Sequence, residues 1–357
     1  MPFVLFFTSF LLTFFWCQWL ARGRLRRRFL DAPNERSSHV VAVPRGGGAF
    51  FALTIVIGTI LGGSASIWFV LAYLITAGVG IWDDLKPLPA KTRFHFQFLA
   101  ALCLTFHFYL TLPTAIQAHP VFSILFWLAS VFLILSFVNF INFADGINGY
   151  VSLSALLGIV VFLMISHLKP NLTFIYNSHV LLAPALCLFS GALMAFIYQN
   201  LIRKKVFMGD GGSTVIGLFF ATLGLLFFGE MVQSNADGLF SYILDYLTCW
   251  LLIMSLLSCV FFDCAAMVVA KLFAGAKLSQ AHNNHFYQQL NRDYFKSHAK
   301  TTLALCTMQS LFAIWVFYDF SISSRMSFFI RTTMFLIVYA LTLTFYHLRT
   351  IRKFKVI

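Results

Sequence analysis

The sequence has little charge. Only 10% of its 357 residues are Asp, Glu, Lys or Arg, whereas 60% are hydrophobic. A water-soluble domain normally carries about 25% charged residues, so this composition excludes a soluble globular protein. Several apolar stretches exceed the roughly 18 residues that a helix needs to cross a bilayer. The composition therefore predicts an all-α, polytopic transmembrane bundle.

Acidic residues are scarcer than basic ones. The chain has 12 Asp and Glu against 25 Lys and Arg, which gives a formal net charge of +13. In a soluble protein this excess of basic residues would suggest nucleic-acid binding. In a chain this apolar, it is typical of basic loops that face an anionic cytoplasmic leaflet. We therefore expect the lipid bilayer as a partner and no nucleic acid.

The chain also lacks a cysteine framework and a cleavable leader. Its seven cysteines are scattered without metal-ligand spacing, which is typical of small buried hydrophobic residues. Basic residues follow the first apolar run instead of preceding it, unlike in a signal peptide. This run is expected to remain as a span whose N-terminus lies outside.

Hydropathy predicts about eleven spans within a single domain, 1–357, and ten spans is the alternative count. The basic residues then orient the chain, because 22 of the 25 fall in one set of connections. The positive-inside rule places this set in the cytoplasm, with a periplasmic N-terminus and a cytoplasmic C-terminus. The expected spans are 3–21, 46–63, 65–82, 97–112, 121–141, 150–168, 180–200, 212–230, 239–262, 301–319 and 326–348.

Two adjacent carboxylates end the third expected span. Asp83 and Asp84 are followed by three cations, Lys86, Lys91 and Arg93. Charge at membrane depth is costly, so retained acids usually have a function. Paired acids beside cations could bind a divalent metal and a phosphate, and one could act as a base. The alternative is an ordinary charged helix end.

Asn142, Asp145 and Asn148 follow one another in steps of three. Such spacing places polar groups on a slowly drifting face of a helix, and Gly146 and Gly149 then favour its end. Amides and one acid suit the recognition of a nucleobase or a sugar. The alternative is a polar seam between neighbouring helices.

Glycine-rich segments occur twice on the same predicted face. Asp210 precedes two glycines at the start of the eighth span, where a helix N-terminus could bind an anion and the acid could hold magnesium. The alternative is ordinary capping. Gly46–Gly48 could also offer backbone N–H groups to an anion.

His282 and His285 lie in the large loop before the tenth span and share a helical face. They could bind a phosphate or a metal. No third ligand lies nearby in the sequence, so we do not expect zinc. A solvated surface pair is the alternative.

These motifs together resemble the polyprenyl-phosphate N-acetylhexosamine-1-phosphate transferase superfamily, of glycosyltransferase family 4 type. The resemblance runs from about Asp31 to Leu290, and the motifs stand in the family's order. They are Asp31-Ala-Pro-Asn34, Asp83-Asp84 with Ala90-Lys91-Thr92-Arg93, Asn142-Phe-Ala-Asp145-Gly-Ile-Asn148-Gly149, Phe207-Met-Gly-Asp210-Gly-Gly-Ser213 and the His282/His285 loop.

The resemblance implies an Mg²⁺-dependent phosphoglycosyl transferase of the bacterial inner membrane, with Mn²⁺ as an alternative ion. A UDP-N-acetylhexosamine would donate its sugar 1-phosphate to undecaprenyl phosphate and release UMP. Asp83, Asp84 and Asp210 would be catalytic, and Asp210 and Asp84 would be the metal ligands. Family members are often dimeric.

The resemblance also implies a set of substrate-binding residues. They would hold phosphates (Lys91 and Arg93), line the nucleotide pocket (Asn142, Asp145 and Asn148) and contact the diphosphate or sugar (His282 and His285).

The last loop distinguishes branches of the family. The muramoyl-pentapeptide branch has three consecutive histidines there, which this sequence lacks. The loop is closer to the branch that starts O-antigen and related polysaccharides, whose donor would be UDP-GlcNAc or a 6-deoxy relative. The rival interpretations are a transporter of nucleotide sugars or lipid-linked sugars and an inactive scaffold.

Overall fold

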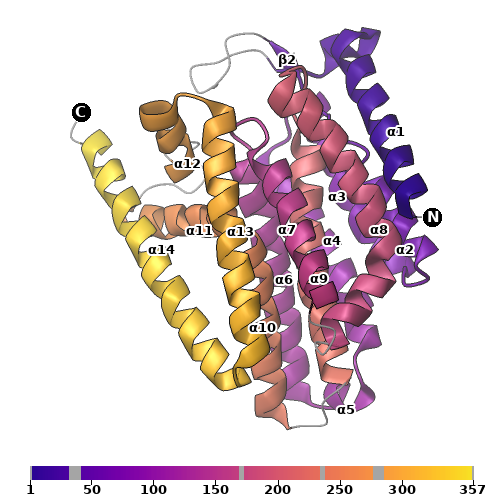
Figure 1. Cartoon of the computed structure of the whole chain (residues 1–357), viewed down its shortest axis with the longest axis vertical. Coiled ribbons are helices and arrows are strands. Elements are labelled where there is room, and N and C mark those ends of the chain that lie inside the picture. The colour runs from indigo at the N-terminus through magenta and orange to yellow at the C-terminus, as the bar shows by residue number, and fades with distance from the viewer. Residues whose placement is uncertain (1, 32–41, 169–172, 234–237, 276–284, 356–357) are drawn as a thin grey trace.

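The computed structural model describes residues 2–31, 42–168, 173–233, 238–275 and 285–355, which form a bundle of long helices (Figure 1). The helices are α1 (Pro2–Arg22), α2 (Phe51–Leu61), α3 (Ile67–Leu85), α4 (Ala90–Thr111), α5 (Thr114–Gln117), α6 (Pro120–Ala144), α7 (Tyr150–Leu168), α8 (Thr173–Ile197), α9 (Asp210–Gln233), α10 (Leu239–Leu256), α11 (Ser258–Phe273), α12 (Phe286–Gln289), α13 (His298–Ile322) and α14 (Arg325–Lys355). The shorter elements are η1 (Arg24–Arg28), β1 (Leu30–Asp31), β2 (Val43–Pro44), η2 (Tyr198–Ile202) and η3 (Leu290–Phe295).

The long helices form because their sequences are apolar and their starts are capped. The Ser66 hydroxyl accepts a hydrogen bond from the Phe69 N–H at the start of α3. Ser297 does the same for the Lys300 N–H of α13, and Pro120 opens α6, where a missing N–H costs nothing. These signals set the helix starts without help from distant parts of the chain.

Among the described residues, the structure has fewer full-length spans than the eleven expected, and two of the expected spans correspond to shorter apolar helices. Within the described ranges, nine helices are long and apolar enough to cross a membrane, and two shorter apolar helices, Phe51–Leu61 and Tyr150–Met164, accompany them. The all-α, polytopic class is therefore confirmed. Lys169, one of the few basic residues expected outside the cytoplasmic set, lies outside the described residues.

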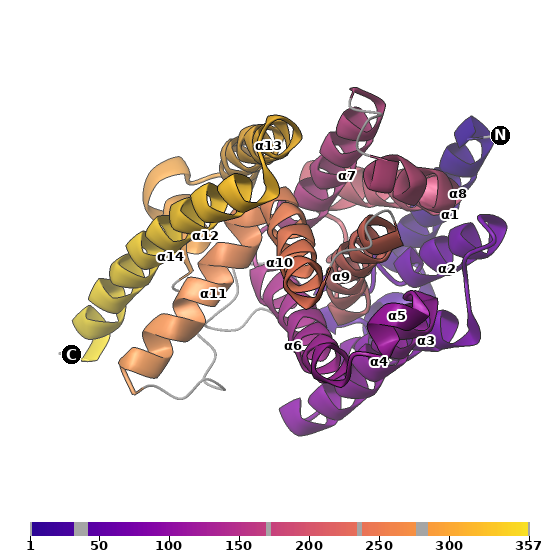
Figure 2. The ribbon, with the colours of Figure 1, turned by 90° about the horizontal axis from the view of Figure 1, so that it is seen from below.

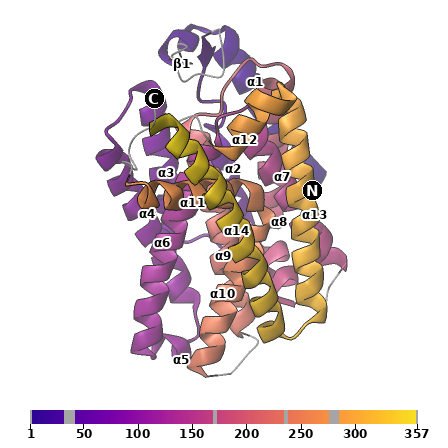
Figure 3. The same cartoon turned by 90° about the vertical axis from the view of Figure 1, so that its left-hand side faces the viewer.

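Two expected spans extend several residues beyond the corresponding helices. The span expected at 46–63 begins only at Phe51, because the Gly47 and Gly48 N–H groups donate to carbonyls of the segment before α9 and not within a helix. The span expected at 239–262 ends at Leu256, and the backbone at Leu257 leaves the helical region. The next helix, α11, lies across the bundle (Figure 3). This turn buries Asp263, which is 2% exposed.

Helix α9 lies at the centre of the bundle, surrounded by α3, α6, α8 and α10 (Figure 2). From its second turn to Gly229 it is almost entirely apolar and almost wholly buried, as expected for a helix enclosed by others. A Cβ at Gly217 would lie 2.6 Å from the Phe137 carbonyl oxygen of α6, so glycine permits this close approach. The core thus fixes the position of α9 and of its first residue, Asp210.

The two ends of the bundle carry different polar groups. At the end formed by the α13–α14 turn, Arg325 pairs with buried Asp245 at 2.9 Å, and Arg331 pairs with Asp319 at 2.8 Å (Figure 1). The opposite end carries η1, the antiparallel pair of β1 and β2, and α12. The first turn of α9 and the end of α3 meet at this second end.

Candidate active site

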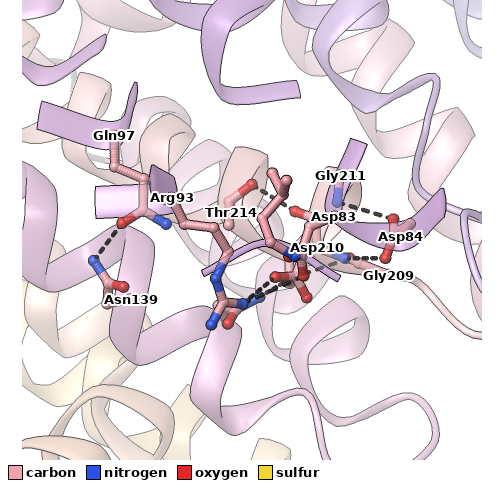
Figure 4. Close-up of polar contacts among 12 residues, drawn as sticks. Asp83, Asp84, Arg93, Gln97, Asn139, Gly209, Asp210, Gly211 and Thr214 are labelled. Carbon is pink, nitrogen blue, oxygen red and sulfur yellow. Dashed lines mark hydrogen bonds and ion pairs between the residues drawn. The ribbon is translucent and has the colours of Figure 1, made fainter. Parts of the chain in front are cut away.

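Asp83 and Asp210 are brought together by one cation. Arg93 Nη1 lies 3.3 Å from Asp83 Oδ2 and 3.0 Å from Asp210 Oδ2 (Figure 4). The three residues come from the end of α3, the first turn of α4 and the start of α9. Their side chains are 10%, 21% and 34% exposed for Asp83, Asp210 and Arg93 respectively. The predicted meeting of these motifs is therefore present in the structure.

The turn between α3 and α4 orients Asp83. The Leu88 N–H donates to Asp83 Oδ1 at 2.7 Å. Pro87 and Pro89 flank Leu88 and keep this turn out of the helix, so that α4 begins anew at Ala90. The second carboxylate oxygen then points to Arg93. The start of α4 precedes the expected span by several residues, which places Arg93 on a helix.

Asp84 caps the central helix. Its carboxylate accepts hydrogen bonds from the backbone N–H groups of Asp210, at 2.9 Å, and Gly211, at 3.2 Å. Gly209 has φ +78°, and a Cβ there would collide with the Asp84 carboxylate. The expected anion site at the start of α9 is thus filled by a side chain of the same protein. The prediction that these N–H groups receive an external anion is wrong.

The Gly46–Gly48 segment also has a different role from the one expected. The Gly47 N–H donates to the Phe207 carbonyl at 2.9 Å, and the Gly48 N–H donates to the Met208 carbonyl at 3.0 Å. A Cβ at Gly48 would lie 2.5 Å from the Gly212 Cα. These N–H groups are used within the protein, and the glycines allow the segment to pack on the start of α9.

The amide motif reaches the same place through α6. Asn142 Nδ2 donates to Ser213 Oγ at 2.9 Å, in the first turn of α9. Asp145 follows the end of α6, and burial together with the nearby charge of Asp210 raises its pKa to about 7, although Arg45 opposes this. Asn139, one turn earlier, forms a polar seam with Gln97 at 3.0 Å (Figure 4).

Asn148 contacts α13, and Lys91 is exposed. The Asn148 N–H donates to His298 Nδ1 at 3.2 Å, and its carbonyl accepts from Thr302, so its backbone is tied to α13. Lys91 is exposed in the first turn of α4. Their binding roles stay predictions. His282 lies outside the described residues.

His285 lies in a buried cluster that the sequence did not indicate. Its Nδ1 is 3.7 Å from Asp263 Oδ2, and Asp263 Oδ1 is 2.8 Å from His347 Nε2. Burial lowers the pKa of His285, although Asp263 opposes this, so the ring is neutral near pH 7. The signal that could have identified Asp263 was an acid beside an apolar run, which is costly unless used.

The histidine segment contacts the amide motif. Tyr287 stacks on His285 with 5.6 Å between ring centroids, and its hydroxyl donates to the Phe143 carbonyl at 3.2 Å. A Cβ at Gly146 would collide with that hydroxyl. The predicted glycine thus makes room for Tyr287 next to Asp145. Tyr287 thus connects two motifs that are far apart in the sequence, around Asp145 and His285.

The acids suit a magnesium ion that is completed by substrate. No group of three or more His, Cys, Asp or Glu side chains able to hold a metal is found among the described residues. Mg²⁺ commonly binds one or two carboxylates together with substrate phosphates. Asp83 and Asp210 offer two carboxylates that share a single guanidinium, and this donor set fits such an ion. Asp84 is already engaged with the first turn of α9.

Comparisons with known proteins point to the same chemistry. A model described as glycosyl transferase family 4 matches residues 66–228. The decaprenyl-phosphate N-acetylglucosaminephosphotransferase of Mycobacterium tuberculosis (strain H37Rv) is 31% identical over 281 residues, or 72% of this chain and 68% of the relative. The Mycobacterium leprae protein of that name is 28% identical over 72% and 69%. A phospho-N-acetylmuramoyl-pentapeptide-transferase of Aliarcobacter butzleri is 25% identical over 64% and 73%.

The matched segments include the acidic and amide motifs. Asp83, Arg93, Asp145 and Asp210 all fall within residues 66–228, whereas His285 and Asp263 lie beyond them. The resemblance noted from the motifs is confirmed, and the chain belongs to glycosyl transferase family 4, in the polyprenyl-phosphate N-acetylhexosamine-1-phosphate transferase superfamily.

Proposed function

We propose that this protein transfers the sugar 1-phosphate of a UDP-N-acetylhexosamine to undecaprenyl phosphate and releases UMP. The observation that carries the proposal is the shared contact of Arg93 with Asp83 and Asp210 at one end of an apolar bundle. A lipid phosphate and a water-soluble nucleotide can meet only at such an end. The named relatives, which act on polyprenyl phosphates or on muramoyl-pentapeptide, support it.

The reaction exchanges one phosphoanhydride for another. An oxygen of the lipid phosphate attacks the sugar-bearing phosphorus, the bond to the UMP phosphate breaks, and UMP leaves with the electron pair. A phosphate oxygen is already nucleophilic near neutral pH, so positioning and charge neutralisation dominate catalysis. Asp83 would accept a proton from a protonated lipid phosphate.

A bound Mg²⁺ would supply charge neutralisation at the diphosphate. Asp210 would hold it, with Asp83 or Asp84 as the second carboxylate. Arg93 contacts both Asp83 and Asp210 in the structure and would hold a phosphate oxygen. Lys91 precedes Arg93 by two residues and is exposed.

The nucleotide and sugar would lie against the amide motif. Asn142, Asp145 and Asn148 supply hydrogen-bonding groups there. With a pKa of about 7, Asp145 is partly protonated at neutral pH and can donate as well as accept. His285, neutral and adjacent through Tyr287, would face the diphosphate or sugar, with His282 from the same loop.

The donor and pathway are narrower parts of the proposal. The loop lacks three consecutive histidines, which favours UDP-GlcNAc or a 6-deoxy relative and an initiating step of O-antigen or related polysaccharide synthesis. Relatives named for N-acetylglucosamine transfer are 28% to 31% identical, whereas those named for the muramoyl-pentapeptide are 23% to 26% identical. We place the protein in the bacterial inner membrane, N-terminus periplasmic and C-terminus cytoplasmic, as a homodimer.

Turnover of labelled donors tests the proposal. Purified protein, undecaprenyl phosphate and Mg²⁺ or Mn²⁺ should convert a UDP-sugar into equal amounts of UMP and an organic-soluble sugar lipid. In sealed inside-out vesicles, donor added outside should be used. If a folded preparation releases no UMP from any donor in a panel that includes 6-deoxy sugars, the proposed transferase activity is refuted. Uptake of intact UDP-sugar without UMP would indicate a transporter.

A further inference from the structure

The segment that carries His285 is too short to hold itself in place. Helix α12 contains four residues, Phe286–Gln289, and continues as a single π turn. An isolated helix of this length is unstable in water. Its position must therefore come from contacts with the rest of the bundle, and these contacts converge on one buried carboxylate.

Four polar groups, two backbone N–H groups and two histidine rings, surround the Asp263 carboxylate of α11. Its Oδ1 accepts from the Phe286 N–H at 3.0 Å and lies 2.8 Å from His347 Nε2 of α14. Its Oδ2 accepts from the Tyr287 N–H at 3.4 Å and lies 3.7 Å from His285 Nδ1. A buried carboxylate is costly unless such partners compensate it. Asp263 is 2% exposed and His347 is fully buried.

The contacts made by Asp263 lead directly to the candidate site. It holds the first two N–H groups of α12, which follow His285. Tyr287 reaches the Phe143 carbonyl on the other side, two residues before Asp145. A displacement of α12 would therefore move His285 and Tyr287 relative to Asp145.

Helix α14 reinforces this arrangement at a second point. Tyr346 donates its hydroxyl to Gln289 Oε1 at 2.7 Å, and its ring packs edge-on against Phe286 with 5.4 Å between centroids. Two consecutive residues of α14, Tyr346 and His347, thus hold both ends of α12. Helix α14 thus supports the candidate site through its contacts with α12 and Asp263.

We propose that Asp263 and His347 are positioning residues that hold His285 and Tyr287 against the sugar-nucleotide side of the pocket. The proposal rests on the proposed function for its kinetic consequence. Removal of either partner should weaken donor use specifically, because α12 borders the amide motif and not the Asp83–Arg93–Asp210 contact. The KM for undecaprenyl phosphate should stay unchanged.

Two substitutions of His347 give a matched kinetic test. H347Q keeps an N–H group that can donate to Asp263, whereas H347L leaves the carboxylate without it. We expect H347L to raise the KM for the donor about ten- to hundred-fold, as for the loss of supporting contacts in other proteins. The donor KM of H347Q should stay close to that of the wild type. D263N should resemble H347L. Equal donor KM values for wild type and H347L would overturn the proposal.

A buried acid at the other end serves as the control for general destabilisation. Asp245 is fully buried and paired with Arg325. D245N should lower thermal stability and leave both KM values unchanged. If D245N raised the donor KM as much as H347L does, the effect would reflect folding alone and the positioning role would be wrong.

Hydrogen exchange separates this inference from the proposed function, because it requires no turnover. In H347L, the amides of Phe286 and Tyr287 should exchange faster than in the wild type, while those of Asp210 and Gly211 stay protected. Unchanged exchange at Phe286 and Tyr287 would overturn the proposal even in an active protein. Faster exchange in a protein that lacks all turnover would refute only the proposed reaction.

Discussion

The two ends of the bundle treat their carboxylates differently. At the α13–α14 end, Asp245 and Asp319 each have an arginine of their own. At the other end, Asp83 and Asp210 share Arg93. One acid for each cation gives a neutral contact that joins helices. Two acids for one cation leave negative charge that could accept a metal ion, so the imbalance supports the proposal that the reaction takes place at this end.

The largest expected effect comes from exchanging one acid at each end. D210N should lower kcat by about a thousandfold, as for the loss of a principal electrostatic contact in other enzymes, and leave membrane insertion intact. D245N should instead cost stability, by less than the roughly 3–5 kcal/mol of a fully buried pair, because Arg325 is 36% exposed. Turnover per folded molecule and thermal unfolding measure the two effects. Normal activity of D210N would show that Asp210 is not needed to hold the metal ion.

A smaller effect should come from comparing two helix caps. D84A removes the carboxylate that accepts from the Asp210 and Gly211 N–H groups, so kcat should fall about ten- to hundred-fold through displacement of Asp210. S66A removes the cap of α3 at the opposite end, which should cost about 1 kcal/mol of stability and no activity. Steady-state kinetics and denaturant unfolding would check both. Equal kcat values for D84A and wild type would show that α9 holds Asp210 without this cap.

The smallest expected effect is a pH dependence of stability at the reactive end. The pKa of Asp145 is raised to about 7 from an ordinary value of 3.8, so between these values the folded protein binds the proton more tightly. Stability should therefore fall as pH rises from about 4 to about 7. D145N should lose this part of the slope. Melting temperatures measured against pH without divalent ions would give this slope. Identical slopes for D145N and the wild type would contradict the raised pKa of Asp145.

Much of this architecture could be predicted from local signals. Apolar length predicted eleven spans, and the basic residues indicated that the polar motifs share one end. The convergence of Asp83, Arg93 and Asp210 followed from this topology and the family resemblance. The end of α10 at Leu257 could not be predicted, because the apolar run continues beyond it.

The contacts that hold the site could not be predicted, because they join residues far apart in the sequence. Asp84 and Gly211 are 127 positions apart, and Asp263 and His347 are 84 apart. No periodic pattern encodes such pairs. Likewise, the sequence around Gly47 and Gly48 suggests an anion site. Only the structure shows that the N–H groups of these glycines already donate to the Phe207 and Met208 carbonyls.

The contact between α11 and α14 bears on biosynthesis. The ribosome makes Asp263 long before His347, so a carboxylate that needs a buried partner reaches the membrane without it. That acid must stay hydrated or protonated until α14 inserts. Helix α12 then gains its support from α14 late, and a nascent chain stalled before α14 would carry Asp83, Arg93 and Asp210 without the contact that His347 makes with Asp263.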